Sequence, residues 1–539
     1  MAIAYYGTDD VGFAYRIALT TGTDYIIGSG VTIGSTGSVG MLYNDFGNLD
    51  VSILVLGTVF GNYAAIQMIS DNSIAATIDI GSDAAVYSSD NDAILIYAGE
   101  FSNDGFVNLV NNGALLGTDN GVAATYVEVI DIQNNGAIST TSNVVDSFAA
   151  LNLLAFSVVV GNTGQISAAA GDGIKLNSDF GWFGGTFELN NTGTVTSSAD
   201  AIHSDSYHDL INNSGEIFGE LQLGVGENSD YAFGDTVNNS GLIFGNIFLG
   251  YGNDVVDGEN GAVFGTIYGG AGDDVITSGM EDDSLQGGVG DDELHGGIGD
   301  DLLNGDDGDD FLFGDEGDDF IFGGGGADEM WGGTGVDTAS YEESRDGVRV
   351  SLNAGRGWFG GAQSDTLRDI ENLIGSDRRD TLIGSAAANL IQGENADDVL
   401  NGLAGNDTIF GGNGDDNILG GDGNDYLSGD RHQDKLTGGT GEDIFAYLNI
   451  LDSGPAQSER DNITDFTQGQ DLIDLTELGD LFFGGTAFSG TAGEIIYYHV
   501  AGGTRTVVEI DTDGDSVADF GILLSNAAHT MTAADFLFV

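Results

Sequence analysis

Apolar residues recur every nine positions over two stretches of this chain. In residues 269–340 the apolar residue is the eighth of each nonapeptide, and a glycine-rich turn separates it from the next. The first stretch places Ile276, Leu285, Leu294, Leu303, Leu312, Ile321, Met330 and Ala339 at this position. Residues 375–446 repeat the pattern from Leu382 to Phe445. Short strands that each point one apolar residue inward predict a stacked solenoid in which two nonapeptides make one turn.

Residues 1–268 carry a looser recurrence, in which an Asn/Gly turn precedes a short β-branched run. The marked glycines are 20 to 29 residues apart: Gly113, Gly136, Gly164, Gly193, Gly215, Gly241 and Gly261. This period predicts the rungs of a right-handed parallel β-helix, with Asn side chains hydrogen-bonding along the stack. A β-sandwich is the alternative for such irregular strand–turn sequence. Residues 249–257 (LGYGNDVVD) already resemble a nonapeptide, so we expect the β-helix to continue into a β-roll without a linker.

The sixth nonapeptide position is aspartate in fifteen of sixteen repeats, and Asn389 is the exception. A carboxylate is a hard oxygen ligand suited to Ca²⁺, and glycine turns bring backbone carbonyls close to it. Because stacked strands lie about 4.8 Å apart, the aspartates form columns of like charge that Ca²⁺ converts into coordination. A metal-free, glycine-rich solenoid leaves them unexplained. The predicted ligands are Asp274, Asp283, Asp292, Asp301, Asp310, Asp319, Asp328, Asp337, Asp380, Asp398, Asp407, Asp416, Asp425, Asp434 and Asp443.

These two blocks resemble the RTX, or hemolysin-type, calcium-binding nonapeptide repeats. The resemblance implies a parallel β-roll with multiple bound Ca²⁺ ions. Residues 341–374 are similar to the linker between RTX blocks. Six of the twelve basic residues lie in this linker or just beyond it, and we expect them to counter acidic neighbours: Arg345, Arg349, Arg356, Arg368, Arg378 and Arg379.

Residues 447–539 resemble the C-terminal region of serralysin-type secreted proteins. The matching runs include Asp461–Phe466, Gly469–Leu475 and the final Ala533–Val539. The resemblance implies an uncleaved signal that type I secretion machinery recognises, in a β-rich cap; a plain final strand is the alternative. Protease activity does not carry over, because none of the six histidines has the zinc-binding His-Glu-x-x-His spacing. Asp511, Asp513, Asp515 and Asp519 are spaced like an acidic Ca²⁺ loop or a solvated turn.

The net charge of the chain excludes several classes of binding partner. The chain has 86 acidic and 12 basic residues, a net charge of -74, which excludes nucleic acid and anionic membrane surfaces as partners. No apolar run is long enough to span a membrane, and the N-terminus lacks the basic region of a cleavable signal peptide. There are no cysteines, so we expect calcium to stabilise the fold outside the cell.

Two functional classes follow from this all-β organisation. The first is a secreted, calcium-dependent structural protein of the bacterial cell surface or extracellular matrix, as a surface-layer, biofilm-matrix or adhesin component. Its partners would be Ca²⁺, further copies of itself or cell-surface polysaccharide. The alternative is a β-helix enzyme, a lyase or epimerase acting on acidic polysaccharide. That chemistry needs a basic residue near the substrate carboxylate, and residues 1–268 offer only Arg16 and Lys175. No catalytic residue is predicted.

Overall fold

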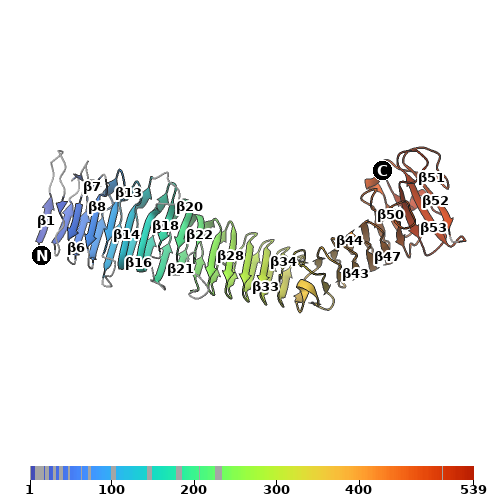
Figure 1. Ribbon diagram of the computed structural model, residues 1–539, viewed down its shortest axis with the longest axis horizontal. Coiled ribbons are helices and arrows are strands. Elements are labelled where there is room, and N and C mark those ends of the chain that lie inside the picture. Colours follow the sequence, from blue (N-terminus) through green and yellow to red (C-terminus); the bar gives the residue numbers. More distant parts are fainter. Residues whose placement is uncertain are drawn as a thin grey trace. The chain divides into compact units, whose positions relative to one another are not determined.

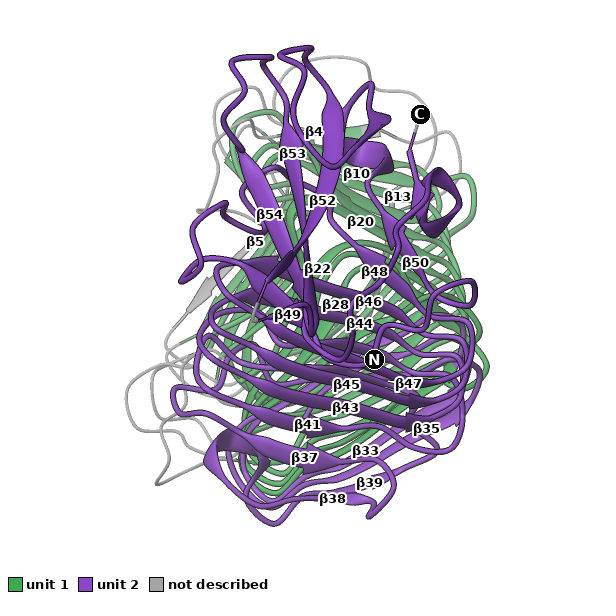
Figure 2. Ribbon diagram, turned by 90° about the vertical axis from the view of Figure 1, so that its right-hand side faces the viewer, with its two compact units in different colours: residues 1–297 green, residues 298–539 purple. Residues whose placement is uncertain are grey.

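The computed structural model describes most of the chain. The described residues are 2–6, 17–18, 23–27, 32–34, 41–45, 49–61, 63–70, 74–98, 105–141, 149–177, 185–205, 207–224, 233–500 and 502–538. Arg16 and Val539, which entered the sequence analysis, lie outside them. The chain divides into two compact units, residues 1–297 (unit 1) and 298–539 (unit 2), coloured separately in Figure 2. The predicted domain boundaries at residues 268, 340, 374 and 446 stay predictions.

Unit 1 is a stack of parallel β rungs, as its pattern of turns and strands predicts (Figure 1). One face of the rung is formed by successive strands that pair in register. These are β6 (Leu49–Val55), β9 (Ile74–Ile80), β12 (Phe106–Asn111), β14 (Val122–Asn134), β16 (Ala149–Asn162), β19 (Gly185–Asn191) and β21 (Tyr207–Asn213). Alternate residues point inward, so β6 has the burial pattern expected of a strand with one side in a core.

A single aliphatic column runs through the core of unit 1. From Ile53 it continues through β-helix rungs and reaches Leu294, which is the eighth residue of a nonapeptide. The intervening strands are β23 (Thr236–Asn239), β26 (Val255–Asp257), β29 (Val275–Thr277) and β31 (Glu293–Ile298). The column members are Ile53, Ile78, Leu109, Ile132, Val160, Leu189, Ile211, Val237, Val256, Ile276 and Leu294. The β-helix therefore continues into the β-roll, as predicted.

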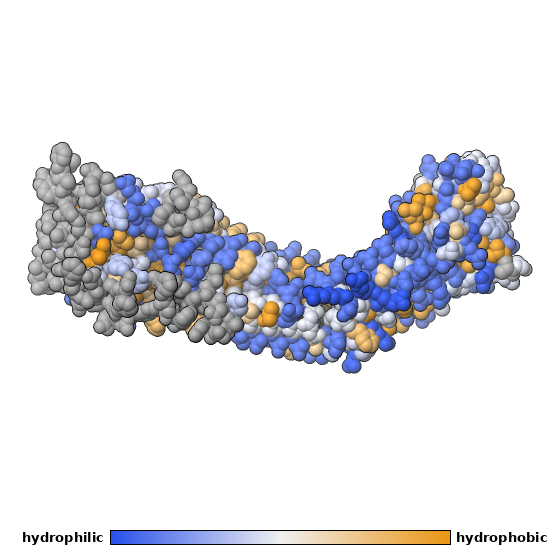
Figure 3. All heavy atoms as spheres, viewed as in Figure 1, coloured by the Kyte–Doolittle hydropathy of each residue, from blue (hydrophilic) through white to orange (hydrophobic). Residues whose placement is uncertain are grey.

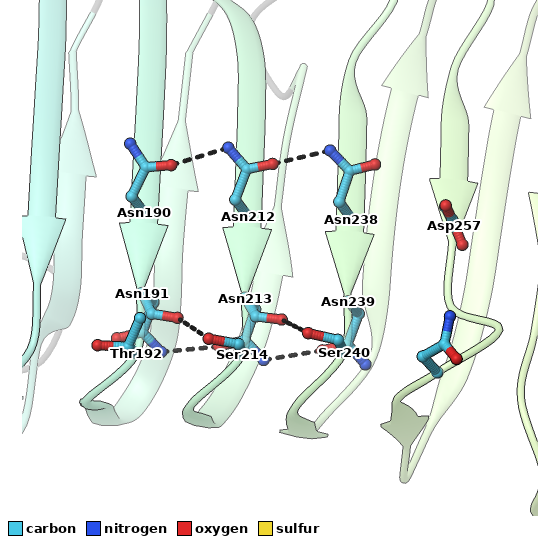
Figure 4. Close-up of a pocket in the computed structure, with 11 residues that line it drawn as sticks. Asn190, Asn191, Thr192, Asn212, Asn213, Ser214, Asn238, Asn239, Ser240 and Asp257 are labelled. Carbon is cyan, nitrogen blue, oxygen red and sulfur yellow. Dashed lines mark hydrogen bonds between the residues drawn. The ribbon is translucent and has the colours of Figure 1, made fainter.

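Asparagines close the same rungs at their turns, also as predicted. In the buried ladder, each side-chain amide donates to the next Oδ1 at 2.8 Å, from Asn111 through Asn134, Asn162, Asn191 and Asn213 to Asn239. An exposed ladder beside it joins Asn190, Asn212 and Asn238 (Figure 4). The buried ladder satisfies polar groups that the tight turns would otherwise leave buried and unpaired.

Unit 2 contains the remainder of the first nonapeptide block and the whole of the second block. Its second block has a six-residue strand every nine residues: β43 (Val399–Ala404), β44 (Thr408–Asn413), β45 (Asn417–Asp422), β46 (Tyr426–Arg431) and β47 (Lys435–Thr440). The first four of these strands each pair in parallel with the strand eighteen residues later, so that Leu400 meets Ile418 and Ile409 meets Leu427. Two nonapeptides therefore make one turn, as predicted.

The C-terminal part of unit 2 is an antiparallel sheet of β52 (Glu494–Val500), β53 (Arg505–Asp511) and β54 (Phe520–Leu524). Strand β54 pairs with β49 (Asp461–Ile463), which itself follows β47 in the roll. The sheet thus covers the last turn of the second block, as expected of a β-rich cap. Among the described residues, the structure contains no helix with the length and apolar character needed to cross a membrane.

Candidate calcium-binding columns

All fifteen predicted ligand aspartates are buried, each with at most 4% of its surface exposed. The aspartate directly precedes the short strand and lies two residues before the inward apolar residue, so the start of the strand holds it against the core. Burying so many carboxylates is costly unless each finds a partner. Their surroundings therefore decide what the columns can bind.

In most of these carboxylates, one oxygen belongs to a backbone ladder. The N–H of Asp398 donates to Oδ1 of Asp416 at 2.7 Å, and the N–H of Asp416 donates to Oδ1 of Asp434 at 2.8 Å. The same bond joins Asp407 to Asp425 and Asp425 to Asp443 on the other side of the roll. This ladder aligns the carboxylates into two columns, with one aspartate for each turn in each column.

The second oxygen is buried in most repeats without a hydrogen-bond donor. Among the described residues this holds for Oδ2 of Asp274, Asp319, Asp328, Asp337, Asp398, Asp407, Asp416, Asp425 and Asp434. It points toward the first glycine of its own repeat: a Cβ on Gly411 would lie 2.4 Å from Oδ2 of Asp416 and 2.6 Å from the carbonyl oxygen of Gly429. Only glycine leaves this space between a carboxylate and a carbonyl. An all-oxygen cradle of this kind fits Ca²⁺.

The raised pKa values of the column aspartates also favour a bound cation. Burial, reinforced by neighbouring aspartates, raises the pKa of Asp274, Asp328 and Asp398 to about 8. Burial likewise raises the pKa of Asp461 well above its ordinary value, next to Asp434. The charged form of each column is therefore unfavourable by itself, and a bound divalent cation supplies the missing counter-charge.

Three repeats differ because a serine occupies the turn. Oδ2 of Asp283 accepts the N–H of Gly279 at 3.2 Å, and Oδ2 of Asp380 accepts the N–H of Ser376 at 2.6 Å. At the asparagine repeat, Nδ2 of Asn389 donates to the carbonyl of Glu371 at 2.6 Å. These side chains already have local partners, so their oxygens are less available to a cation. Asp283 and Asp380 remain predicted ligands.

The columns extend beyond the nonapeptides on both sides. In unit 1 the N–H of Asp209 donates to Oδ1 of Asp235, Asp235 donates to Asp254, and Asp254 donates to Asp274, at 2.6 to 2.8 Å. The column position is apolar in the preceding rungs, at Ala76, Val107, Ile130, Val158 and Phe187. It changes to aspartate at Asp209. In the sequence, Asp209, Asp235 and Asp254 are each followed by one residue and then an apolar residue, but they do not recur every nine residues.

The columns also continue through unit 2. In the inter-block segment, the backbone N–H of Asp328 donates to Oδ1 of Asp365, and that of Asp337 donates to a carboxylate oxygen of Glu371. In the cap, the backbone N–H of Asp434 donates to Oδ1 of Asp461, and that of Asp443 donates to Oδ1 of Asp471. The nine-residue period does not include these four acceptors. Each of them nevertheless lies two residues before a buried aliphatic residue, as the nonapeptide aspartates do.

The acidic loop of the cap is a separate cluster. Carboxylate oxygens of Asp511, Asp513 and Asp519 lie within 4.8 Å of one another. Both oxygens of Asp511 already accept backbone N–H groups, from Gly514 and Ser516. This arrangement also describes a solvated turn, so the predicted cation loop stays a prediction.

Comparisons with known proteins match two families over parts of the chain. Residues 266–285, 278–312 and 304–339 match the RTX calcium-binding nonapeptide repeat, and residues 327–538 match the peptidase M10 serralysin C-terminal region. No curated protein matches the chain in sequence.

Similar solved structures include two subunits of the Azotobacter vinelandii mannuronan C5-epimerase. The AlgE6R2 subunit is 31% identical over 27% of this chain and 91% of its own length, with a TM-score of 0.23. The AlgE6R3 subunit is 28% identical over 30% of this chain and 77% of its own length, with a TM-score of 0.21. The chain carries RTX nonapeptide repeats, which bind multiple Ca²⁺ ions, followed by a serralysin-type C-terminal region. This combination supports a secreted calcium-dependent protein.

Proposed function

We propose that the chain is a calcium-dependent structural protein of the bacterial cell surface or extracellular matrix, exported by type I secretion machinery and folded outside the cell. The observation that carries the calcium dependence is the set of buried Oδ2 atoms without donors, of which Asp416 is an example. Without a cation these columns oppose folding. Extracellular Ca²⁺ modules typically bind near 10⁻⁴ to 10⁻³ M, on the order of extracellular concentrations. The chain then stays unfolded in the cytosol and folds after export.

We further assign the ligands to the columns as a whole. The predicted nonapeptide aspartates, above all those with an available Oδ2, coordinate Ca²⁺ together with loop carbonyls. Asp254 extends the set into unit 1, because its Oδ2 is also buried without a hydrogen-bond donor. Asp461 extends it into the cap for the same reason.

A structural role is supported by the outward strand faces. In unit 1, Phe218, Phe244 and Phe264 stack with ring centroids 4.7 and 4.8 Å apart, and Phe244 and Phe264 are exposed. In unit 2, Leu302 and Phe311 are exposed at outward positions. The face of unit 2 visible in Figure 3 is mostly hydrophilic. An exposed apolar row such as this phenylalanine stack marks a surface that associates with other molecules, here further copies of the chain.

The enzyme alternative has less support. Lys175 is the described basic residue that it would use, and its Nζ pairs with Asp172 at 3.4 Å. The neighbouring His203 contacts Asp200 and Asp205, and these two hydrogen bonds raise its pKa to about 9. A uronate polymer would meet three carboxylates here, which repel it.

The test is a Ca²⁺ titration of metal-stripped protein, followed by circular dichroism and light scattering on one sample. We expect β-structure to appear near millimolar Ca²⁺ and scattering to rise with it. Folding without a rise in scattering would refute self-assembly, and a monomeric adhesin or an enzyme would then be the better explanation. A circular dichroism spectrum that does not change with Ca²⁺ would refute the calcium dependence itself.

A further inference from the structure

The inter-block segment of unit 2 forms a small sheet with an unusual outer face. Strand β39 (Thr366–Arg368) pairs in parallel with β35 (Glu329–Thr334), and β38 (Arg356–Gly357) pairs antiparallel with β39. Strand β37 (Arg349–Ser351) completes the hairpin with β38. The four strands place residues from three separate segments of the chain on one surface.

Arginine and tryptophan alternate on that surface. Met330, Val350, Gly357 and Leu367 point inward and are buried, so their strand neighbours point outward. Arg349 lies over the ring of Trp358 at 5.0 Å, and Arg368 lies over the ring of Trp331 at 4.2 Å. We call the outward residues Trp331, Arg349, Arg356, Trp358 and Arg368 the Arg–Trp face.

The arginines of this face have no carboxylate partner. Among the described residues, no ion pair within 4.0 Å involves Arg349, Arg356 or Arg368, and all three are exposed. By contrast, Arg379 pairs with Asp397 and Arg460 pairs with Glu509. The sequence predicted that these arginines counter acidic neighbours, and for this face the structure shows otherwise. In a chain with 86 acidic residues, unpaired arginines leave their donors to a ligand from outside.

A hollow of about 480 Å³ adjoins the face, and it suits a sugar. Arg356, Trp358, Phe359, Gln363 and Thr366 contribute to its lining, with Phe359 60% exposed. Aromatic surface packs against the apolar face of a pyranose, and amide and hydroxyl groups bond its hydroxyls. A guanidinium binds a carboxylate through two parallel hydrogen bonds.

We propose that the Arg–Trp face binds a carboxylate-bearing sugar residue of an acidic glycan. Glu329 lies in register with Thr366 at the edge of the face, and it disfavours a ligand whose negative charges are spaced more closely than one per sugar, such as polyphosphate. Asp365 also lines the hollow, but it is buried and its oxygens accept from the N–H of Asp328 and the hydroxyl of Tyr341. It is therefore directed into the fold. This site goes beyond the structural role and does not depend on self-assembly.

The experiment uses the full chain loaded with Ca²⁺ and a trigalacturonate probe, which is too short to gel with Ca²⁺. Trp331 and Trp358 are two of the three tryptophans, so tryptophan fluorescence reports occupancy directly. We expect the acidic trisaccharide to change the fluorescence and its carboxyl-reduced form to bind much more weakly. Arg356→Ala should weaken binding roughly tenfold or more, as for a lost charge-assisted contact, and Arg356→Lys should lose part of the affinity because the bidentate geometry is gone.

Arg505→Ala is the matched control, because Arg505 is an exposed arginine on β53 of the cap, outside the Arg–Trp face. It should leave binding unchanged. Circular dichroism and the Ca²⁺ midpoint of each variant should match those of the parent chain, which separates loss of the site from loss of the fold. Equal binding of the reduced sugar, equal loss in Arg505→Ala, or tighter binding of inorganic polyphosphate would each overturn the proposal.

Discussion

Replacing Asp416 by asparagine should shift folding in opposite directions with and without calcium. Asp416 is buried in the middle of its column, Oδ1 accepts the N–H of Asp398 at 2.7 Å, and Oδ2 has no hydrogen-bond donor. Asparagine keeps the volume of the side chain and an Oδ1 acceptor. The column already tolerates an asparagine at Asn389, whose backbone N–H continues the ladder to Oδ1 of Asp407. The substitution therefore removes mainly the negative charge and one oxygen ligand.

The magnitude without calcium follows from the pKa. Burial raises the pKa of Asp416 from 3.8 to about 7. At about 1.4 kcal/mol for each tenfold change in proton affinity, keeping this carboxylate charged in the fold costs at most about 4 kcal/mol above pH 7. Because the folded-state pKa is raised, the contribution of Asp416 to stability is present below pH 4 and lost as the pH rises through 7. Asp416→Asn should remove this loss and favour the calcium-free fold at pH 8.

With calcium the sign reverses, because the same carboxylate becomes a ligand. Removing one partner of a buried charge pair costs about 3–5 kcal/mol, so the variant should need more Ca²⁺ to fold. The assay is circular dichroism against pH in calcium-free buffer and against Ca²⁺ at pH 8. Asp415→Asn is the control, since Asp415 is exposed and its Oδ1 only accepts the N–H of Gln433. If both variants shift alike, or if Asp416→Asn shifts both transitions in one direction, the reasoning is refuted.

Three further predictions test the scaffold. Asn162→Ala interrupts the buried ladder between Asn134 and Asn191 and should cost about 2–3 kcal/mol in urea unfolding, whereas exposed Asn135→Ala should cost less than about 1 kcal/mol; equal losses would contradict the role of burial. Gly423→Ala should raise the Ca²⁺ midpoint strongly, because its Cβ would lie 1.5 Å from the Gly405 carbonyl oxygen, while Gly469→Ala, with open space around it, should cost only about 1–2 kcal/mol of backbone strain. Arg460→Ala leaves Glu509 of the cap without its cationic partner, with only the hydroxyl of Tyr498 still donating to it at 2.8 Å. The substitution should cost about 3 kcal/mol in thermal unfolding, and a loss no larger than that of Arg505→Ala would contradict this prediction.

Much of this protein could be predicted from its sequence because its repeats are local. The eighth-position aliphatic residues and sixth-position aspartates recur at fixed spacing, so any parallel stack that buries the first aligns the second. The Asn ladder followed for the same reason: an Asn/Gly turn recurring once per rung brings equivalent side chains within hydrogen-bond distance. Ca²⁺ followed from oxygen chemistry alone.

Only the tertiary structure shows which carboxylates join the columns without following the nine-residue repeat. The rungs of Asp209, Asp235 and Asp254 differ in length, so only strand pairing shows that they share a column with Asp274. The inter-block segment joins the columns at Asp365 and Glu371 across 37 and 34 residues.

The sequence by itself thus determined the solenoid, its cation and most of its ligand candidates, because these depend on residue type and spacing. The fold alone decided which carboxylate oxygens are available and which are taken by a neighbouring serine turn, because hydrogen-bond geometry is set by side-chain direction. It also decided that Arg349, Arg356 and Arg368 share one face with Trp331 and Trp358. Residues from three segments meet there only after the strands have paired.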